Sequence, residues 1–192
     1  MYGVMITTLT AEKWISHGLA ALANHGFGAL KADVLAKSLK VTRGSFYWHF
    51  RDVAEYHKAV IELWRARATE NIIAQIETVA DRAERLPTLF RTALGGNIAL
   101  DKAMRAWAQS EPVAKKALAE VEAIRVQYLE QLLDTANVPT KSIKSRARIL
   151  HWAFVGYSNS PSIKAVELDA ILEEAIGFAL SNVELAQAGR RS

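Results

Sequence analysis

One short segment of the sequence carries side chains suited to contact with a nucleic acid. Arg43 can donate two parallel hydrogen bonds to guanine O6 and N7. Gly44 has no side chain, which allows a helix to approach base edges closely. Tyr47 and Trp48 offer apolar rings that can pack on a thymine methyl group. Donors to phosphate oxygens are also present, namely Thr42, Ser45, Tyr47 and His49.

A short helix must hold these side chains on one face. Val41 and Phe46 stand at the spacing of a hydrophobic staple around an N-cap at Thr42. Phe46 and Phe50 lie one turn apart, which predicts a buried inner face. A second helix is expected just before this one, over residues 32–39, with a tight turn between them. This order predicts a helix-turn-helix, in which the second helix enters the major groove.

Core packing is the alternative interpretation of the same string, because a run of aromatic residues is more often buried than exposed. Burial of every side chain would require a helix that is apolar all round, which Thr42, Arg43 and Ser45 contradict. Gly44 also costs a helix interior up to about 1 kcal/mol relative to Ala. Local stability therefore does not explain the string, and DNA binding is favoured.

The whole chain is expected to be all-α, since its 192 residues include only 10 Gly and 4 Pro and show no convincing period-two alternation. Helices are expected near residues 10–25, 32–39, 42–49, 52–79, 88–94, 97–109, 112–135, 141–157 and 167–183. The fourth is expected to run unbroken for about 28 residues, or roughly 42 Å. The charged run 81–85 and Pro87 are expected to form a bend.

Composition excludes several classes of protein. An apolar fraction of 51% permits a folded core, and the absence of cysteine excludes disulfides and zinc thiolates, as suits a reducing cytosol. No run of about 18 uncharged apolar residues is long enough for a transmembrane helix. Residues 1–10 have no basic residue before their apolar stretch, which disfavours a secretory signal. We therefore expect a cytoplasmic protein with no membrane partner.

The positive charge is concentrated near the start of the chain. Residues 1–60 hold seven Lys or Arg and four Asp or Glu, which gives +3 of the total net charge of +4. A local basic excess favours a polyanionic partner.

Catalysis is not expected. The sequence has no G-x-S-x-G elbow, no phosphate-binding G-x-x-x-x-G-K-[ST] loop and no H-E-x-x-H pair. The spacing of His17 and His25, and of His49 and His57, does not form a credible metal site with the nearby acids. We expect no catalytic residues, no metal and no cofactor.

The segment Ala32–Phe50, and most specifically Val41–Phe50, resembles the DNA-binding motif of the TetR family of bacterial transcriptional regulators. The preceding Ala23–Phe27 is similar to the end of the family's first helix, so the resemblance covers about residues 10–60. It implies a helix-turn-helix DNA-binding domain over residues 1–58. A long helix would join this domain to a helical ligand-binding and dimerisation domain over residues 59–192.

The resemblance also implies a function and its partners. Members are usually homodimeric repressors that bind a pseudo-palindromic double-stranded DNA operator and are released by a small-molecule effector. Carried over by position, it implies that Arg43, Gly44 and Tyr47 approach bases. The residues implied in backbone or mixed contacts are Thr42, Ser45, Trp48 and His49.

Three residues depart from the family's pattern. Lys31 replaces the usual Ser or Thr at the start of the second helix, where a charged phosphate contact would replace a hydroxyl one. Lys40 replaces the usual Gly of the turn, and Val53 replaces a Lys that commonly binds phosphate. The last two support an alternative function, a helical small-molecule or protein-binding module that no longer binds DNA.

Apolar residues beyond position 59 give two further sets of candidates. Ordinary core packing explains each of them as an alternative. The candidate pocket walls are Phe90, Leu94, Met104, Trp107, Tyr128 and Trp152. The candidate dimer interface, in which helix pairs from two copies form a four-helix bundle, consists of Ile149, Ala153, Gly156, Ile171, Ala175 and Phe178.

Overall fold

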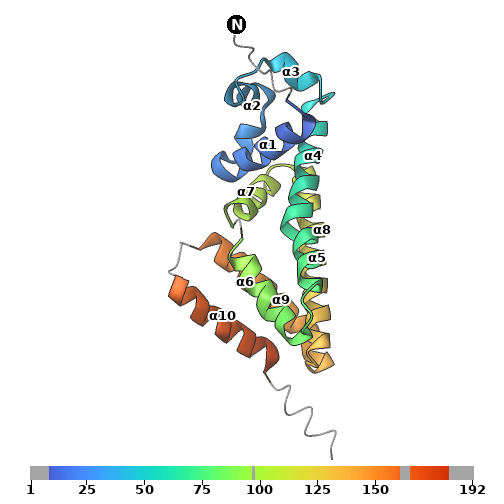
Figure 1. Cartoon of the computed structure of the whole chain (residues 1–192), viewed down its shortest axis with the longest axis vertical. Helices are drawn as coiled ribbons and strands as arrows, with labels where there is room; N and C mark the ends of the chain where they lie inside the picture. Colours follow the sequence, from blue (N-terminus) through green and yellow to red (C-terminus); the bar gives the residue numbers. More distant parts are fainter. Residues whose placement is uncertain (1–8, 97, 161–164, 182–192) are drawn as a thin grey trace, which may run out of the picture. The chain divides into compact units, whose positions relative to one another are not determined.

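The computed structural model describes residues 9–96, 98–160 and 165–181, and every regular element in these ranges is helical (Figure 1). This confirms the predicted all-α fold. The α-helices are α1 (Ala11–His25), α2 (Ala32–Ser38), α3 (Arg43–Tyr47), α4 (Val53–Arg65), α5 (Asn71–Glu77), α6 (Arg82–Leu94), α7 (Ile98–Ala108), α8 (Pro112–Thr135), α9 (Thr140–Asn159) and α10 (Ala165–Leu180). A 3₁₀ turn, η1, covers Phe27–Leu30, and a π-turn, η2, covers Ala66–Glu70. Residues 1–8, which include most of the segment considered above as a secretory signal, lie outside the described ranges.

Local side-chain chemistry sets several helix ends. Thr10 Oγ1 accepts a hydrogen bond from the Lys13 amide at 3.3 Å and so caps α1. Gly26, with φ of 74°, ends the same helix. Asp52 Oδ1 accepts from the Glu55 amide at 2.7 Å and caps α4. These three ends agree with the expected helix near residues 10–25 and with the expected start of a helix at residue 52.

Helix α6 corrects one expectation, because it begins at Arg82 and continues through Pro87, where a bend was expected. Asp81 Oδ1 accepts from the Ala83 amide at 2.9 Å, so the charged run is the capped first turn of a helix. Pro87 lies inside this helix and cannot donate a backbone hydrogen bond to Ala83. Its side chain is buried, as are those of Leu86 and Phe90 in the same helix.

A second correction concerns the long helix expected over residues 52–79. Helix α4 ends at Arg65, the π-turn η2 follows, and α5 resumes at Asn71. Sequence periodicity did not reveal this interruption, because apolar residues occur on both sides of it.

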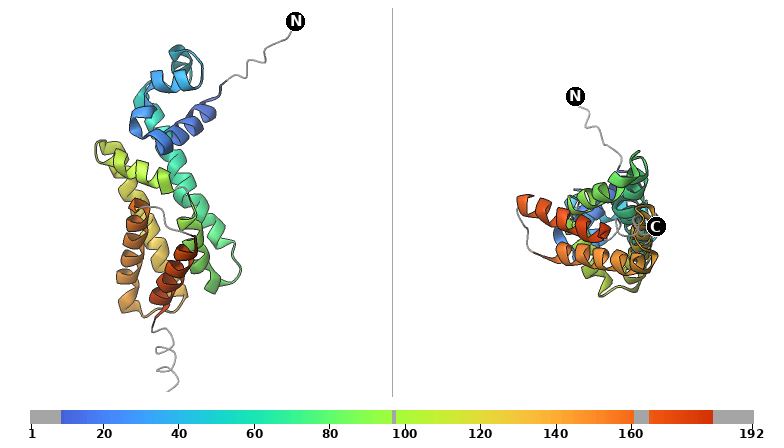
Figure 2. Two further views of the ribbon diagram at one scale, coloured as in Figure 1. Left: turned by 90° about the vertical axis from the view of Figure 1, so that its left-hand side faces the viewer. Right: turned by 90° about the horizontal axis from the view of Figure 1, so that it is seen from below.

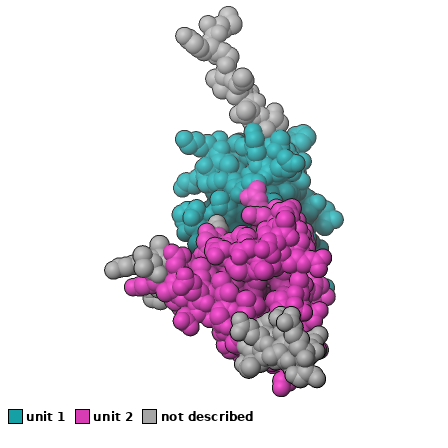
Figure 3. Space-filling view, turned by 60° about the horizontal axis from the view of Figure 1, so that its bottom comes forward, with its two compact units in different colours: residues 1–66, 99–117 teal, residues 67–98, 118–192 magenta. Residues whose placement is uncertain are grey.

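The chain divides into two compact units (Figure 3). The first unit comprises Met1–Ala66 and Ala99–Ala117, and the second comprises Arg67–Ile98 and Leu118–Ser192. All of α4 lies in the first unit with α1–α3, as do α7 and the start of α8. The boundary between a DNA-binding and a ligand-binding domain after residue 58 stays a prediction.

Aromatic side chains form the core of the first unit. Trp14, Phe46 and Tyr56 are fully buried, and their rings meet edge to face, with centroids 5.4 Å apart for Trp14–Phe46 and 5.2 Å apart for Phe46–Tyr56. Such pairs each contribute about 0.5–1.5 kcal/mol beyond the burial of their area. This cluster ties α1, α3 and α4 together.

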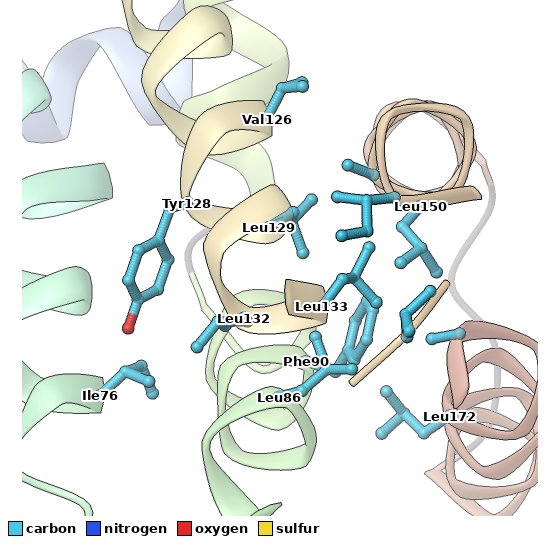
Figure 4. Close-up of a cluster of buried hydrophobic side chains, with 14 residues drawn as sticks. Ile76, Leu86, Phe90, Val126, Tyr128, Leu129, Leu132, Leu133, Leu150 and Leu172 are labelled. Carbon is cyan, nitrogen blue, oxygen red and sulfur yellow. The ribbon is translucent and has the colours of Figure 1, made fainter. Parts of the chain in front are cut away.

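A separate cluster forms the core of the second unit (Figure 4). Helices α6, α9 and α10 pack against one another, and α5 packs on α6 (Figures 1 and 2). The buried members are Ile76, Leu86, Phe90, Val126, Tyr128, Leu129, Leu132, Leu133, Val138, Ile143, Ala147, Leu150, Leu172 and Ala179.

Candidate nucleic-acid interface

The inner side of α3 is fixed by Phe46. This side chain is fully buried and packs between Trp14 of α1 and Tyr56 of α4, with Phe50 at a centroid distance of 5.1 Å. Because α3 has only five residues, this one anchor decides which side of the helix faces solvent.

Arg43 and Tyr47 lie one turn apart on the exposed side of α3. Arg43 Nη2 donates to Tyr47 Oη at 3.2 Å, and the guanidinium carbon lies 5.7 Å from the ring centroid. This hydrogen bond raises the pKa of Arg43. Tyr47 is 44% exposed and Trp48 is 88% exposed. The outer side of α3 therefore presents a cation beside two aromatic rings, which is the combination expected of a surface that contacts bases and phosphates.

The remaining predicted DNA-binding residues also reach solvent. Lys31, Thr42 and Gly44 are exposed, whereas Ser45 and His49 are half-buried. Thr42 has the backbone conformation of an N-cap, but its side chain does not cap α3, in contrast to the expectation.

The turn between α2 and α3 closes in the manner that glycine usually permits. Lys40 has φ of 56°, in the left-handed region that is uncommon for residues other than glycine. The Lys40 amide donates to Lys37 O at 3.2 Å, and the Val41 amide donates to Ala36 O at 3.0 Å. These two bonds are those of a Schellman motif. Lys40 is therefore strained, but the geometry of the turn is kept.

The first turn of α4 is capped by two carboxylates. Asp52 accepts from the Glu55 amide, and Glu55 Oε2 accepts from the Arg51 amide at 2.8 Å, which is a capping box. The bond from the Glu55 amide, supported by Arg51 Nε at 3.2 Å, lowers the pKa of Asp52. Val53 thus follows an acidic cap, and Arg51, two residues earlier, is the nearest basic residue in the sequence.

Two exposed residues of α2 were not selected from the sequence. Val34 and Lys37 face solvent, whereas Ala32, Leu35 and Ala36 are buried. The apolar spacing of the three buried residues was a sufficient signal to identify the outer face of this helix.

The six candidate pocket residues are not brought together. Phe90 and Tyr128 belong to the core of the second unit, and Leu94 packs against it. Met104 and Trp107 are buried in the first unit, where the Trp107 ring stacks on Phe27 at 5.0 Å.

Trp152 is the sixth candidate, and it lines a groove between α8 and α9. The groove has a volume of about 540 Å³ and is also lined by Glu122, Val126, Arg148 and His151. Trp152 is 63% exposed. His151 is buried, and its Nε2 lies 3.6 Å from Glu122 Oε1.

Helices α9 and α10 expose large apolar side chains. Ile149, Trp152, Ile171 and Phe178 are all exposed. Among the other dimer candidates, Ala153 and Gly156 are exposed and Ala175 is half-buried. The second unit therefore has apolar side chains in contact with solvent on two neighbouring helices.

Arg146 fixes the end of one of these helices. Its Nη1 donates to Ala179 O and Ser181 O, both at 2.8 Å, and its guanidinium carbon lies 5.9 Å from the Phe178 ring centroid. A buried cation thereby satisfies backbone carbonyls at the C-terminus of α10.

Within the described residues, no group of three or more His, Asp or Glu side chains is placed to hold a metal ion. No helix in the part of the chain that the structure describes is long and apolar enough to cross a membrane.

Residues 15–55 match the family model described as bacterial regulatory proteins, tetR family. This confirms the resemblance seen in the sequence. It also agrees with the expectation that the chain is not an enzyme. No curated protein matches the chain.

Solved structures share the fold over most of the chain. A TetR-family transcriptional regulator from Rhodococcus sp. has a TM-score of 0.66 at 18% identity, covering 89% of this chain and 98% of that one. The fatty acid degradation regulator FadR from Bacillus halodurans has a TM-score of 0.66 at 16% identity, covering 94% and 98%. The superantigen PfiT has a TM-score of 0.68 at 19% identity, covering 94% and 100%. At these identities the likeness shows the fold.

Proposed function

We propose that the protein is a sequence-specific DNA-binding transcriptional regulator, since residues 15–55 match the family model of bacterial regulatory proteins, tetR family. The observation that carries the proposal is the two-sided character of α3. Phe46 is buried in the aromatic core, whereas Arg43, Tyr47 and Trp48 face solvent. Core packing accounts for the first residue and not for the other three.

Recognition of bases is assigned to Arg43 and Tyr47. One amino group of Arg43 bonds to the Tyr47 hydroxyl, and the other donors of the guanidinium can address guanine O6 and N7. The stacked ring restricts the arginine side chain, so less entropy is lost when it binds. The absence of a side chain at Gly44 lets α3 approach the base edges.

Phosphate contacts are assigned to Lys31 and to the hydroxyl and imidazole groups around α3. Lys31 is exposed at the N-cap of α2 and brings a full positive charge to a position where the motif that the sequence resembles usually has Ser or Thr. These contacts fix the position of α3 on the duplex without selecting a sequence.

We further propose that the protein is a homodimer joined through α9 and α10. The exposed apolar side chains Ile149, Trp152, Ile171 and Phe178 would be covered by the same face of a second copy. Small residues Ala153 and Gly156 would let the helices approach closely. A dimer places two copies of α3 on successive turns of B-DNA, about 34–36 Å apart, and so favours a pseudo-palindromic operator.

Repression and its release by a small molecule complete the proposal. The groove between α8 and α9 is the candidate effector site, and α8 runs from the first unit into the second. An effector that prefers the conformation unable to bind DNA lowers operator affinity. By linkage, DNA weakens effector binding by the same factor, typically about 1–3 kcal/mol.

The test is binding to the DNA that flanks the protein's own gene, measured by gel shift at several salt concentrations. Arg43→Ala is expected to weaken binding to the cognate site by about ten- to a hundredfold and to relax the preference at one base pair. Arg91→Ala is the matched control, since it removes an exposed arginine of α6 in the second unit. It should leave affinity unchanged.

Two results would contradict the proposal. Equal loss on all sequences with Arg43→Ala would remove base reading from this residue. A wild-type protein that shows no salt-dependent binding to any DNA would favour the alternative function, a helical module that no longer binds DNA.

A further inference from the structure

The π-turn η2 lies between α4 and α5 and holds one residue more than a regular α-helical turn. Tyr56, Val60, Ile61 and Trp64 are buried in α4, and Thr69 of η2 is the next buried residue, five positions after Trp64. Residues five apart lie about 140° apart around a regular α-helix, and the wider turn brings Thr69 closer to the side of Trp64.

A side chain from another helix supports this turn. Arg125 of α8 donates from Nη2 to Ala68 O at 3.2 Å and from Nε to Thr69 Oγ1 at 3.3 Å. A π-turn breaks the regular succession of helical hydrogen bonds, so its backbone needs partners from outside the helix. The planar fork of a guanidinium can bond to a carbonyl and a hydroxyl at the same time.

The same guanidinium also contacts α9. Its carbon lies 5.3 Å from the centroid of the Phe154 ring, in a cation–π contact. One turn earlier on each helix, Glu122 of α8 and His151 of α9 line the groove described above. On α8, Arg125 lies between the groove residues Glu122 and Val126, and on α9, Phe154 lies between His151 and Val155. The groove and the support of the π-turn therefore share the same two helices.

We propose that Arg125 is a latch on the π-turn η2 and that the turn is the conformational switch of this protein. While Arg125 makes these contacts, the π-turn stays at residues 66–70. Separation of α8 from α9 by a molecule in the groove draws Phe154 and Arg125 away and frees the turn. If the wide turn closes to a regular α-helical turn, the helical phase on one side of it changes by about 100° relative to the other. The effect on DNA rests on the proposed function, whereas the latch itself does not.

Amide hydrogen exchange of the full-length protein tests the latch without DNA. Arg125→Met keeps an unbranched apolar stem of similar bulk but removes the guanidinium with its charge and its donors. We expect at least tenfold faster exchange at residues 66–72 and unchanged exchange in α6 and α10. Arg91→Met, the matched control, should change neither. Unchanged exchange at 66–72, or faster exchange throughout the second unit, would overturn the proposal.

Removal of the extra residue gives a second, sharper test. Deletion of Arg67, an exposed residue of η2, would restore four-residue spacing between Trp64 and the threonine that follows. In this background the turn is no longer wide, so Arg125→Met should accelerate exchange less than twofold. An equal acceleration in both backgrounds would mean that Arg125 supports general packing, which would overturn the latch.

Operator affinity provides the functional readout. We expect Arg125→Met to weaken binding at least fivefold, Arg125→Lys to restore part of the loss, and Arg91→Met to have no effect. Unchanged affinity together with faster exchange at 66–72 would overturn the role of the turn as a switch. If the wild-type protein binds no DNA, the proposed function fails, and the exchange experiments still decide whether the latch exists.

Discussion

Replacement of Gly18 by alanine probes the packing that orients the candidate DNA-binding helix. A Cβ atom at this position would lie 1.8 Å from Tyr56 Oη, 2.8 Å from Tyr56 Cζ and 3.3 Å from Val60 Cγ2. The Tyr56 hydroxyl donates to Trp14 O at 2.9 Å, and the ring is held by Phe46 and Phe50. The ring therefore cannot turn aside without disturbing the support of α3.

The expected magnitude follows from three opposing contributions. Overpacking costs about 1–3 kcal/mol, and loss of the buried hydrogen bond costs about 1 kcal/mol. The higher helix propensity of alanine stabilises the folded protein by up to about 1 kcal/mol. The net loss is about 2 kcal/mol, opposite in sign to the expectation from helix propensity alone.

Urea unfolding followed by circular dichroism measures this change. Gly44→Ala is the matched control, because its Cβ would meet only Thr42 Oγ1, at 3.7 Å. The control should be neutral or more stable by up to about 1 kcal/mol. In the background of Tyr56→Phe, which removes the hydroxyl, Gly18→Ala should cost less. Equal stability of Gly18→Ala and wild type would refute the close packing of α1 on α4.

Three further predictions concern the first unit. Lys40→Gly should stabilise the protein by about 0.5–1 kcal/mol in thermal unfolding, because glycine relieves the strain of φ at 56°. A lower stability than that of the wild type would show that the turn is not strained. Lys31→Ala should reduce the slope of log K for DNA binding against log salt concentration by about one unit per half-site. An unchanged slope would show that Lys31 does not contact phosphate. Burial lowers the pKa of His57, against the opposing influence of Leu30 O and Glu111, so the unfolded chain binds more protons than the folded one. The stability gained from neutral His57 is complete above about pH 6.5 and is lost as the pH falls. The melting temperature of His57→Gln should therefore fall less steeply with acid than that of the wild type. Equally steep falls in the two proteins would contradict this.

Local chemistry allowed the sequence to predict much of the first unit. The cap at Thr10, the glycine ending at Gly26 and the cap at Asp52 depend on groups within three or four residues of one another. The burial of Phe46 was predictable because aromatic residues one turn apart indicate a common inner face. The exposure of Tyr47 and Trp48 then followed from the narrow width of a helix that has one anchored side.

Contacts between segments that are distant in the chain could not be predicted from the sequence. The π-turn depends on Arg125, 56 residues away from Thr69 in the chain. Trp107 was a candidate pocket wall because it is aromatic, but its stacking on Phe27 places it in the first unit. Periodicity gives the buried side of a helix and not the element that covers it, which is why five of the six pocket candidates do not line the groove.

Selection of binding sites from a pool of random duplex DNA tests the central claim most directly. A protein that exposes Arg43 and Tyr47 to base edges on two copies of α3 should enrich one sequence. That sequence should be an inverted repeat with half-site centres about 10–10.5 base pairs apart. Recovery of a pool no different from the starting mixture would contradict the account, because the exposed side of α3 would then read no bases.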